Sequence, residues 1–218
     1  MARRLVFAGF VCCVLIFLPA AASAEDVPKW EAFGGFSYFR AETAPELDVL
    51  GVGHMNTFGW HGSISDYPVH WFGATFDFSG AYGQPTLTIP ANYLGPGVPE
   101  TDQNIKNAIK TSAHTFMFGP SFAYRRHPNV KAFAHVLLGG LNGRSSLTSS
   151  GEMLVGYPVT SSDWVFGYAV GGGFDVKMAK RVGLRMQGDL IRSTFQDGGN
   201  DWQNNIRVSV GLVFRLGD

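Results

Sequence analysis

Seven charged residues lie within segments of the chain that are otherwise rich in apolar and aromatic residues. They are Glu31, Asp77, Asp175, Arg185, Asp189, Arg207 and Arg215. Carboxylates and guanidiniums that share a narrow interior can carry protons or ions, or they can neutralise one another, because an isolated buried charge is costly. Asp189 and Arg207 have opposite signs and lie on consecutive predicted strands. We expect them to belong to one ion-pair network, and Asp77 is a candidate partner for Arg185 or Arg207.

The histidines do not have the spacing of a metal site. Among His54, His61, His70, His114, His127 and His135 there is no H-x-x-H or H-E-x-x-H pattern, in which neighbouring imidazoles could share a metal ion. The sequence therefore predicts no metal site, no cofactor and no catalytic residues. His61 and His135 are expected to form hydrogen bonds inside the protein, whereas His70 and His127 lie near predicted turns.

The elements that position these side chains are predicted to be β-strands. Between residues 71 and 82, apolar and aromatic residues alternate with small or polar ones: Phe72, Ala74, Phe76, Phe78 and Tyr82 against Gly73, Thr75, Asp77 and Ser79. Because successive side chains of a strand point to opposite faces, such a segment separates an apolar medium from a polar one. The same pattern predicts eight strands, at about residues 30–40, 56–65, 71–82, 111–125, 130–141, 164–176, 182–190 and 206–215.

The seven charged residues all lie on the parity opposite the main aromatic face of their strands. The facing of residues 130–141 stays open, because that segment is apolar on both parities. Pro120 interrupts the fourth strand, and since proline cannot donate to a strand ladder, a β-bulge is predicted there. Trp30, Tyr67, Trp71, Trp164 and Trp202 lie near predicted strand ends, where aromatic belts form at membrane interfaces.

The connections between the predicted strands alternate in length. Short turns are expected at residues 66–68, 126–129 and 178–180, and long loops at 41–55, 83–110, 142–163 and 196–203. If these strands cross a membrane they must close into a barrel, because open edges leave backbone groups unsatisfied in lipid. The predicted fold is therefore all-β, an eight-stranded antiparallel up-and-down transmembrane barrel.

The N-terminus predicts export. Arg3 and Arg4 precede an apolar stretch at residues 5–18, and an A-x-A cleavage signal ends at Ala24, so residues 1–24 have the pattern of a secretory signal peptide and 25–218 would form one barrel domain. Cys12 and Cys13 lie in this leader, which leaves no thiol in the exported chain. Loss of Arg3 and Arg4 reduces the 17 basic residues to 15 against 17 acidic ones, and nothing in this balance suggests nucleic-acid binding.

Short stretches of the chain resemble the bacterial outer-membrane β-barrel family, in particular small eight-stranded barrels of the outer membrane protein A transmembrane-domain type. These stretches are residues 33–38, 119–122, 171–175 and 209–214. The resemblance implies an outer-membrane location, short periplasmic turns and long extracellular loops. It also implies a monomer whose partners are outer-membrane lipid, lipopolysaccharide and the barrel-assembly machinery. Ser209, Gly211, Phe214 and Leu216 resemble the C-terminal assembly signal, although the chain continues with Gly217 and Asp218.

The function expected from this resemblance is structural or one of surface interaction, without catalysis. A small-solute or ion channel is the main alternative, although the interior charges would obstruct a water path. Some related barrels modify lipid A with a His-Ser pair on the outer wall, but His135 is followed by Val136. A soluble lipocalin-like barrel would need more charge on its polar face than the small Gly, Ser and Thr residues provide.

Overall fold

The structure is a computed structural model and describes residues 29–42, 54–84, 87–89, 103–105, 109–147, 160–194 and 202–216. The predicted signal peptide at residues 1–24 and much of the predicted long loops lie outside the described residues. No helix within the described residues is long and apolar enough to cross a membrane.

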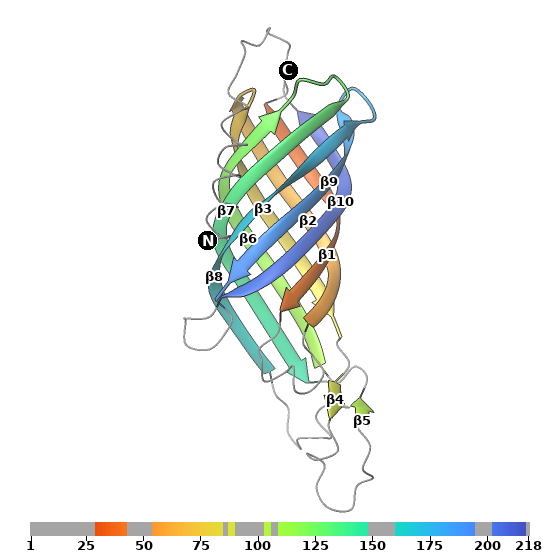
Figure 1. Ribbon diagram of the computed structural model, residues 1–218, viewed down its shortest axis with the longest axis vertical. Helices are drawn as coiled ribbons and strands as arrows, with labels where there is room; N and C mark the ends of the chain where they lie inside the picture. The colour runs from red at the N-terminus through yellow and green to blue at the C-terminus, as the bar shows by residue number, and fades with distance from the viewer. Residues whose placement is uncertain are drawn as a thin grey trace, which may run out of the picture.

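The described residues form ten β-strands. They are β1 (Trp30–Glu42), β2 (His54–Val69), β3 (Phe72–Gly83), β4 (Leu87–Ile89), β5 (Gln103–Ile105), β6 (Ile109–Tyr124), β7 (Val130–Leu147), β8 (Thr160–Lys177), β9 (Val182–Ser193) and β10 (Gln203–Leu216). Eight of them close into an antiparallel up-and-down barrel in the order β1-β10-β9-β8-β7-β6-β3-β2, with the strands strongly tilted (Figure 1). The predicted fold class, a closed eight-stranded barrel, is confirmed.

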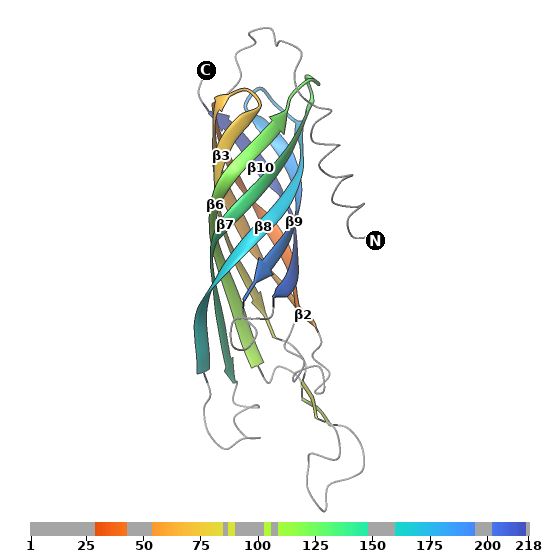
Figure 2. The ribbon, with the colours of Figure 1, turned by 60° about the vertical axis from the view of Figure 1, so that its left-hand side comes forward.

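The strands differ from the prediction mainly at the end with the long connections. β6 begins at Ile109, β7 continues to Leu147 and β8 begins at Thr160, and these strands project past β9 at that end of the barrel (Figure 2). Within the connection predicted as a loop at residues 83–110, β4 and β5 pair as a separate two-stranded sheet. Strands of three residues are too short for their alternation to be recognised in a sequence.

Apolar side chains cover the outside of the barrel, and polar side chains dominate its lumen. Phe76, Phe118, Phe166 and Val208 are exposed, whereas Asp77, Arg207 and many serines and threonines are buried. This arrangement is the reverse of a lipocalin, in which the apolar face would line the cavity.

Strand β7, whose facing the sequence left open, turns Lys131, Phe133, His135 and Leu137 into the lumen and exposes Val136 and Leu138. Phe133 and Leu137 are lumenal although they are apolar, and this explains why both parities of the strand are apolar in the sequence. In β1, Phe33 and Phe39 likewise point inward and are buried.

Two local predictions are wrong. No bulge occurs at Pro120: the pairing of β6 with β7 has the same register at Phe118↔Leu138 and at Ser121↔His135. The missing donor of proline is thus accommodated by a local gap in the ladder, without an extra residue. The register shift lies instead between Asp66 and Val69 in β2, within the predicted turn. Tyr67 is consequently buried in the lumen and does not join an interfacial belt.

The seam between β1 and β10 closes the barrel. The two strands pair from Trp30↔Leu216 to Arg40↔Ile206, with Gly35 opposite Gly211 at the centre. A Cβ atom added to Gly211 would lie 2.3 Å from the Gly34 carbonyl oxygen and 2.4 Å from Gly35 Cα. Glycine is therefore required at this position for the close backbone approach of the two strands.

Candidate functional site in the barrel lumen

A buried arginine joins two carboxylates in the middle of the lumen. Arg207 on β10 donates from Nη1 and Nη2 to Asp77 Oδ1 and Oδ2 at 2.9 and 3.0 Å, and from Nε to Asp189 Oδ2 at 2.8 Å. Its Nη1 also donates to Ser79 Oγ at 3.1 Å. The Arg207 side chain and both carboxylates are fully excluded from solvent. Such a pairing repays the desolvation of three buried charges only because the hydrogen bonds are well formed.

Two histidines extend this arrangement on either side. His61 Nε2 lies 2.6 Å from Asp77 Oδ2, and His135 Nε2 lies 2.8 Å from Asp189 Oδ1. A carboxylate can only accept, so each Nε2 carries a proton and donates it. We call His61, Asp77, Arg207, Asp189 and His135 the central cluster. Gln187 adds hydrogen bonds from Nε2 to both Asp189 oxygens, at 3.2 and 3.0 Å.

A second ion-pair group lies toward the short turns, and we call it the turn-end cluster. It consists of Glu31, Arg125, Lys131, Asp175, Arg185 and Arg215. Arg185 is its centre, since Nε donates to Asp175 Oδ1 at 2.7 Å and Nη2 donates to Glu31 Oε2 at 2.9 Å. Lys131 Nζ donates to Glu31 Oε2 as well, so strands β1, β7, β8 and β9 are joined through this cluster.

The cluster is closed toward the turns by Tyr67 and Arg125. The Tyr67 ring packs against two cations of the cluster, with Arg125 Cζ at 4.5 Å and Lys131 Nζ at 4.9 Å from the ring centroid. The Tyr67 hydroxyl lies 3.0 Å from Ser121 Oγ. Arg125, just beyond the end of β6, donates from Nη2 to Glu31 Oε1 at 3.0 Å. Burial lowers the pKa of the Arg125 guanidinium, while its contact with Glu31 favours the charged form.

Two phenylalanines separate the clusters. Phe33 has the Arg185 guanidinium 5.4 Å from its ring centroid and the His61 ring at 5.1 Å. Phe133 has Arg185 at 4.3 Å and the His135 ring at 6.0 Å. Each phenylalanine thus contacts the turn-end cluster on one side and a histidine of the central cluster on the other.

A third group in the lumen is apolar. It contains Phe39, Ala81, Met117, Leu137, Leu141, Ala169 and Ile191, all buried. Together with the two clusters and the intervening phenylalanines, these side chains fill the interior, as is usual for barrels of eight strands. The two phenylalanines and the apolar group are buried, as in a packed core.

All seven charged residues singled out in the sequence point into the lumen. Asp77, Asp189 and Arg207 come together in the central cluster, and Glu31, Asp175 and Arg185 in the turn-end cluster. Arg215 lies at the margin of the latter, with Nη2 3.8 Å from Asp175 Oδ2. Asp77 pairs with Arg207, whereas Arg185, its other suggested partner, pairs with Glu31 and Asp175.

Sequence reasoning missed Lys131, Arg125 and the lumenal role of Tyr67. Lys131 shares its parity with His135, and this relationship would have placed both inside once the facing of β7 was known. Arg125 and Tyr67 lie at strand ends, where alternation carries little information. Among the described residues, no three His, Cys, Asp or Glu side chains are arranged to hold a metal ion.

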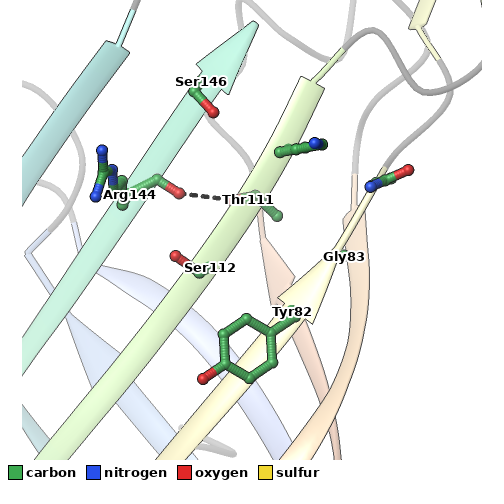
Figure 3. A pocket seen from close by; sticks show the side chains of 8 residues that line it. Tyr82, Gly83, Thr111, Ser112, Arg144 and Ser146 are labelled. Atoms are coloured by element: carbon green, nitrogen blue, oxygen red, sulfur yellow. Dashed lines mark hydrogen bonds between the residues drawn. The ribbon is translucent and has the colours of Figure 1, made fainter. Parts of the chain in front are cut away.

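Outside the lumen, one hollow lies on the wall at the end with the long connections. It has a volume of about 560 Å³ and is lined by Tyr82, Gly83, Gln84, Lys110, Thr111, Ser112, Arg144 and Ser146. Figure 3 shows Tyr82 on β3, Thr111 and Ser112 on β6, and Arg144 and Ser146 on β7 around it.

No protein-family model and no curated protein sequence match the chain. Solved structures similar to it include Ail, the attachment invasion locus protein of Yersinia pestis, with 14% identity and a TM-score of 0.51 over 86% of this chain and 99% of that one. Neisserial surface protein A has 12% identity and a TM-score of 0.55 over 88% and 100% of the two chains. OprG, an outer membrane protein from Pseudomonas aeruginosa, has 9% identity and a TM-score of 0.55 over 89% and 99%. At these identities the likeness concerns the fold.

Proposed function

We propose that this chain, whose fold is that of the small eight-stranded outer-membrane barrels, is an integral outer-membrane protein of a diderm bacterium with a structural or surface-interaction role. The observation that carries this proposal is the combination of an apolar exterior with a lumen filled by paired charges. The apolar wall of such a protein holds it in lipid, and the paired charges of its interior stabilise the fold. Any specific interaction is then left to its loops.

The outer wall supports the membrane location. The side chains of Phe36, Phe76, Phe118, Phe166 and Val210 are exposed although they are large and apolar. An outward apolar band bordered by aromatic residues is the surface that a transmembrane barrel presents to lipid. Trp30 and Trp71 near the short turns, and Trp164 and Trp202 near the long connections, are exposed at the borders of this band.

The orientation in the membrane follows from the connections. Outer-membrane barrels have short periplasmic turns and longer extracellular loops. By that rule the turn-end cluster lies near the periplasm, and the segments that join β1 to β2, β3 to β6, β7 to β8 and β9 to β10 face the exterior. We propose further that the protein is exported by its N-terminal signal, is inserted by the barrel-assembly machinery and acts as a monomer.

A channel is disfavoured by the lumenal contacts. Water or ions would have to cross the central cluster, the turn-end cluster and the apolar group that contains Phe39 and Ile191. The residues at the centre of each, such as Arg207, Arg185 and Leu137, are buried. Lipid-modifying catalysis is disfavoured by the position of His135, which lies inside the barrel and donates to Asp189. His135 therefore does not lie on the outer wall, where the base of a lipid-directed reaction would have to meet its hydroxyl.

The location and orientation can be tested with epitope insertions. One epitope is placed between Gly95 and Pro96, in a long connection, and another at Ala179, in the β8–β9 turn. We expect both proteins in the outer-membrane fraction with heat-modifiable migration on gels, and antibody on intact cells should bind only the first. Recovery of the protein in the soluble periplasmic fraction, or surface labelling of the turn epitope alone, would contradict the proposal.

A further inference from the structure

The outer wall of β3, β6 and β7 changes character stepwise toward the long connections. The row of Phe78, Phe116 and Gly140 is followed by Gly80, His114 and Asn142, then by Tyr82, Ser112 and Arg144, and finally by Lys110 and Ser146. All of these residues have the parity of the outward apolar residues of their strands, such as Phe76 on β3, Phe118 on β6 and Leu138 on β7. The wall thus passes from aromatic to polar and then to cationic within a few residues.

The boundary between the apolar and polar rows is marked by aromatic residues. Trp164 on β8 is exposed and packs near Phe116, with ring centroids 6.0 Å apart. The Tyr82 hydroxyl lies 3.1 Å from His114 Nε2. Amphipathic rings of this kind prefer the level of lipid headgroups. The hollow lined by Lys110 and Arg144 therefore lies where the headgroups of the surrounding leaflet begin.

The residues that line the hollow carry positive charge and include no carboxylate. Lys110 lies opposite Ser146, and Arg144 lies opposite Ser112 on the neighbouring strand, so the two cations are diagonal neighbours on one face. Both are exposed, and among the described residues neither has a carboxylate partner. Thr111 Oγ1 donates to the backbone carbonyl oxygen of Arg144 at 3.5 Å. Ser112 and Ser146 also line the hollow.

We propose that this wall site, formed by Lys110, Arg144, Ser112, Ser146 and Tyr82, binds a phosphate group of lipopolysaccharide in the outer leaflet. A lysine, a guanidinium and hydroxyls within one hollow match the negative charge and multiple acceptors of a phosphate. The hollow opens on the lipid-facing wall, at headgroup depth and on the side of the long connections. A phosphorylated glycolipid that surrounds the barrel fits this position better than a soluble anion. This inference rests on the proposed outer-membrane location.

The test uses the full exported chain, folded in a neutral detergent and checked by heat-modifiable migration. Binding of purified lipopolysaccharide is followed by native mass spectrometry, beside the same material after removal of its phosphates and beside phosphatidylglycerol. The site variant is Lys110→Gln with Arg144→Gln. The matched control is Arg126→Gln with Lys177→Gln, which removes the same charge from exposed positions at the short-turn end.

The site variant should bind lipopolysaccharide about tenfold more weakly, a change of about 1.4 kcal/mol, because it has lost both cations that face the phosphate. The control should bind like the wild type. Removal of the phosphates from lipopolysaccharide should weaken its binding to the wild type by a similar factor and leave its binding to the site variant unchanged. Equal binding by the site variant, an equal loss in the control, or equally tight phosphatidylglycerol binding would overturn the inference. A protein that lies in the outer membrane and fails this test contradicts the wall site alone, whereas a periplasmic protein contradicts the proposed function.

Discussion

Arg207 on β10 and Asp77 on β3 form a two-point ion pair across the lumen, although 130 residues separate them in the sequence. The strands β1 and β2 lie between them in the barrel order, so this contact spans the interior and is not a neighbouring-strand pair. Arg207 also donates to Asp189 on the adjacent strand β9. A single buried guanidinium thereby couples three strands, and its removal would leave two carboxylates without their common cation.

We predict that Arg207→Met strongly destabilises the barrel. Breaking a buried ion pair by removing one partner costs about 3–5 kcal/mol, because the remaining charges stay desolvated and uncompensated. The free energy of unfolding can be measured by urea denaturation in phospholipid vesicles, with tryptophan fluorescence as the signal. The triple variant Arg207→Met, Asp77→Asn and Asp189→Asn should recover part of the loss, since it removes the unpaired charges.

The matched control for this prediction is Arg215→Gln. Arg215 is partly exposed and lies 3.8 Å from Asp175, so its loss should cost less than about 1 kcal/mol. If Arg207→Met unfolds at the same urea concentration as Arg215→Gln, the central cluster does not contribute to stability as described.

We predict that Gly211→Ala weakens the seam between β1 and β10. The added Cβ would meet the backbone of Gly34 and Gly35 at 2.3 and 2.4 Å, and overpacking of this kind costs about 1–3 kcal/mol. Gly188→Ala is the control, because a Cβ there meets nothing within 4 Å. The fraction of heat-modifiable protein after folding into vesicles should fall for Gly211→Ala only. An equal fraction of heat-modifiable protein for the two variants would contradict the requirement for glycine at position 211.

We predict that Val136→Arg, on the outward face of β7, lowers stability in a bilayer by about 2–4 kcal/mol, the cost of an arginine on the lipid face near the midplane. Val69→Arg at the short-turn end of β2 should cost about 0–1 kcal/mol, because it lies near the interface. Both valines are exposed, at 42% and 45%. Urea midpoints in the same vesicles compare the two, and equal midpoints would contradict the assigned facing of β7.

Alternation of polar and apolar residues was sufficient to predict the barrel and the inward facing of Asp77, Asp189 and Arg207. It works there because each of these charges stands among outward aromatic or aliphatic neighbours, and one face of the wall must suit an apolar medium. The pairing of Asp77 with Arg207 was one of two suggested, since the distance between strands across a closed barrel depends on tilt and register, which a sequence does not display.

The failures have equally local causes. Lys131 and the facing of β7 were missed because Phe133 and Leu137 fill the lumen and remove the contrast between parities. Tyr67 was assigned to a turn because Pro68 follows it, whereas a register shift between Asp66 and Val69 carries the strand onward and turns the ring inward. The wall site could not be seen, because Lys110 and Arg144 become neighbours only through the pairing of β6 with β7.

The most direct test of the closed lumen is conductance in planar lipid bilayers. Protein that shows heat-modifiable migration is inserted into the bilayer, with a porin as positive control. If paired charges and the apolar group fill the interior, the membrane current should stay at its baseline across the applied voltages while the porin produces unitary steps. Reproducible unitary steps from the folded protein, which disappear when the protein is heat-denatured before insertion, would contradict a closed lumen.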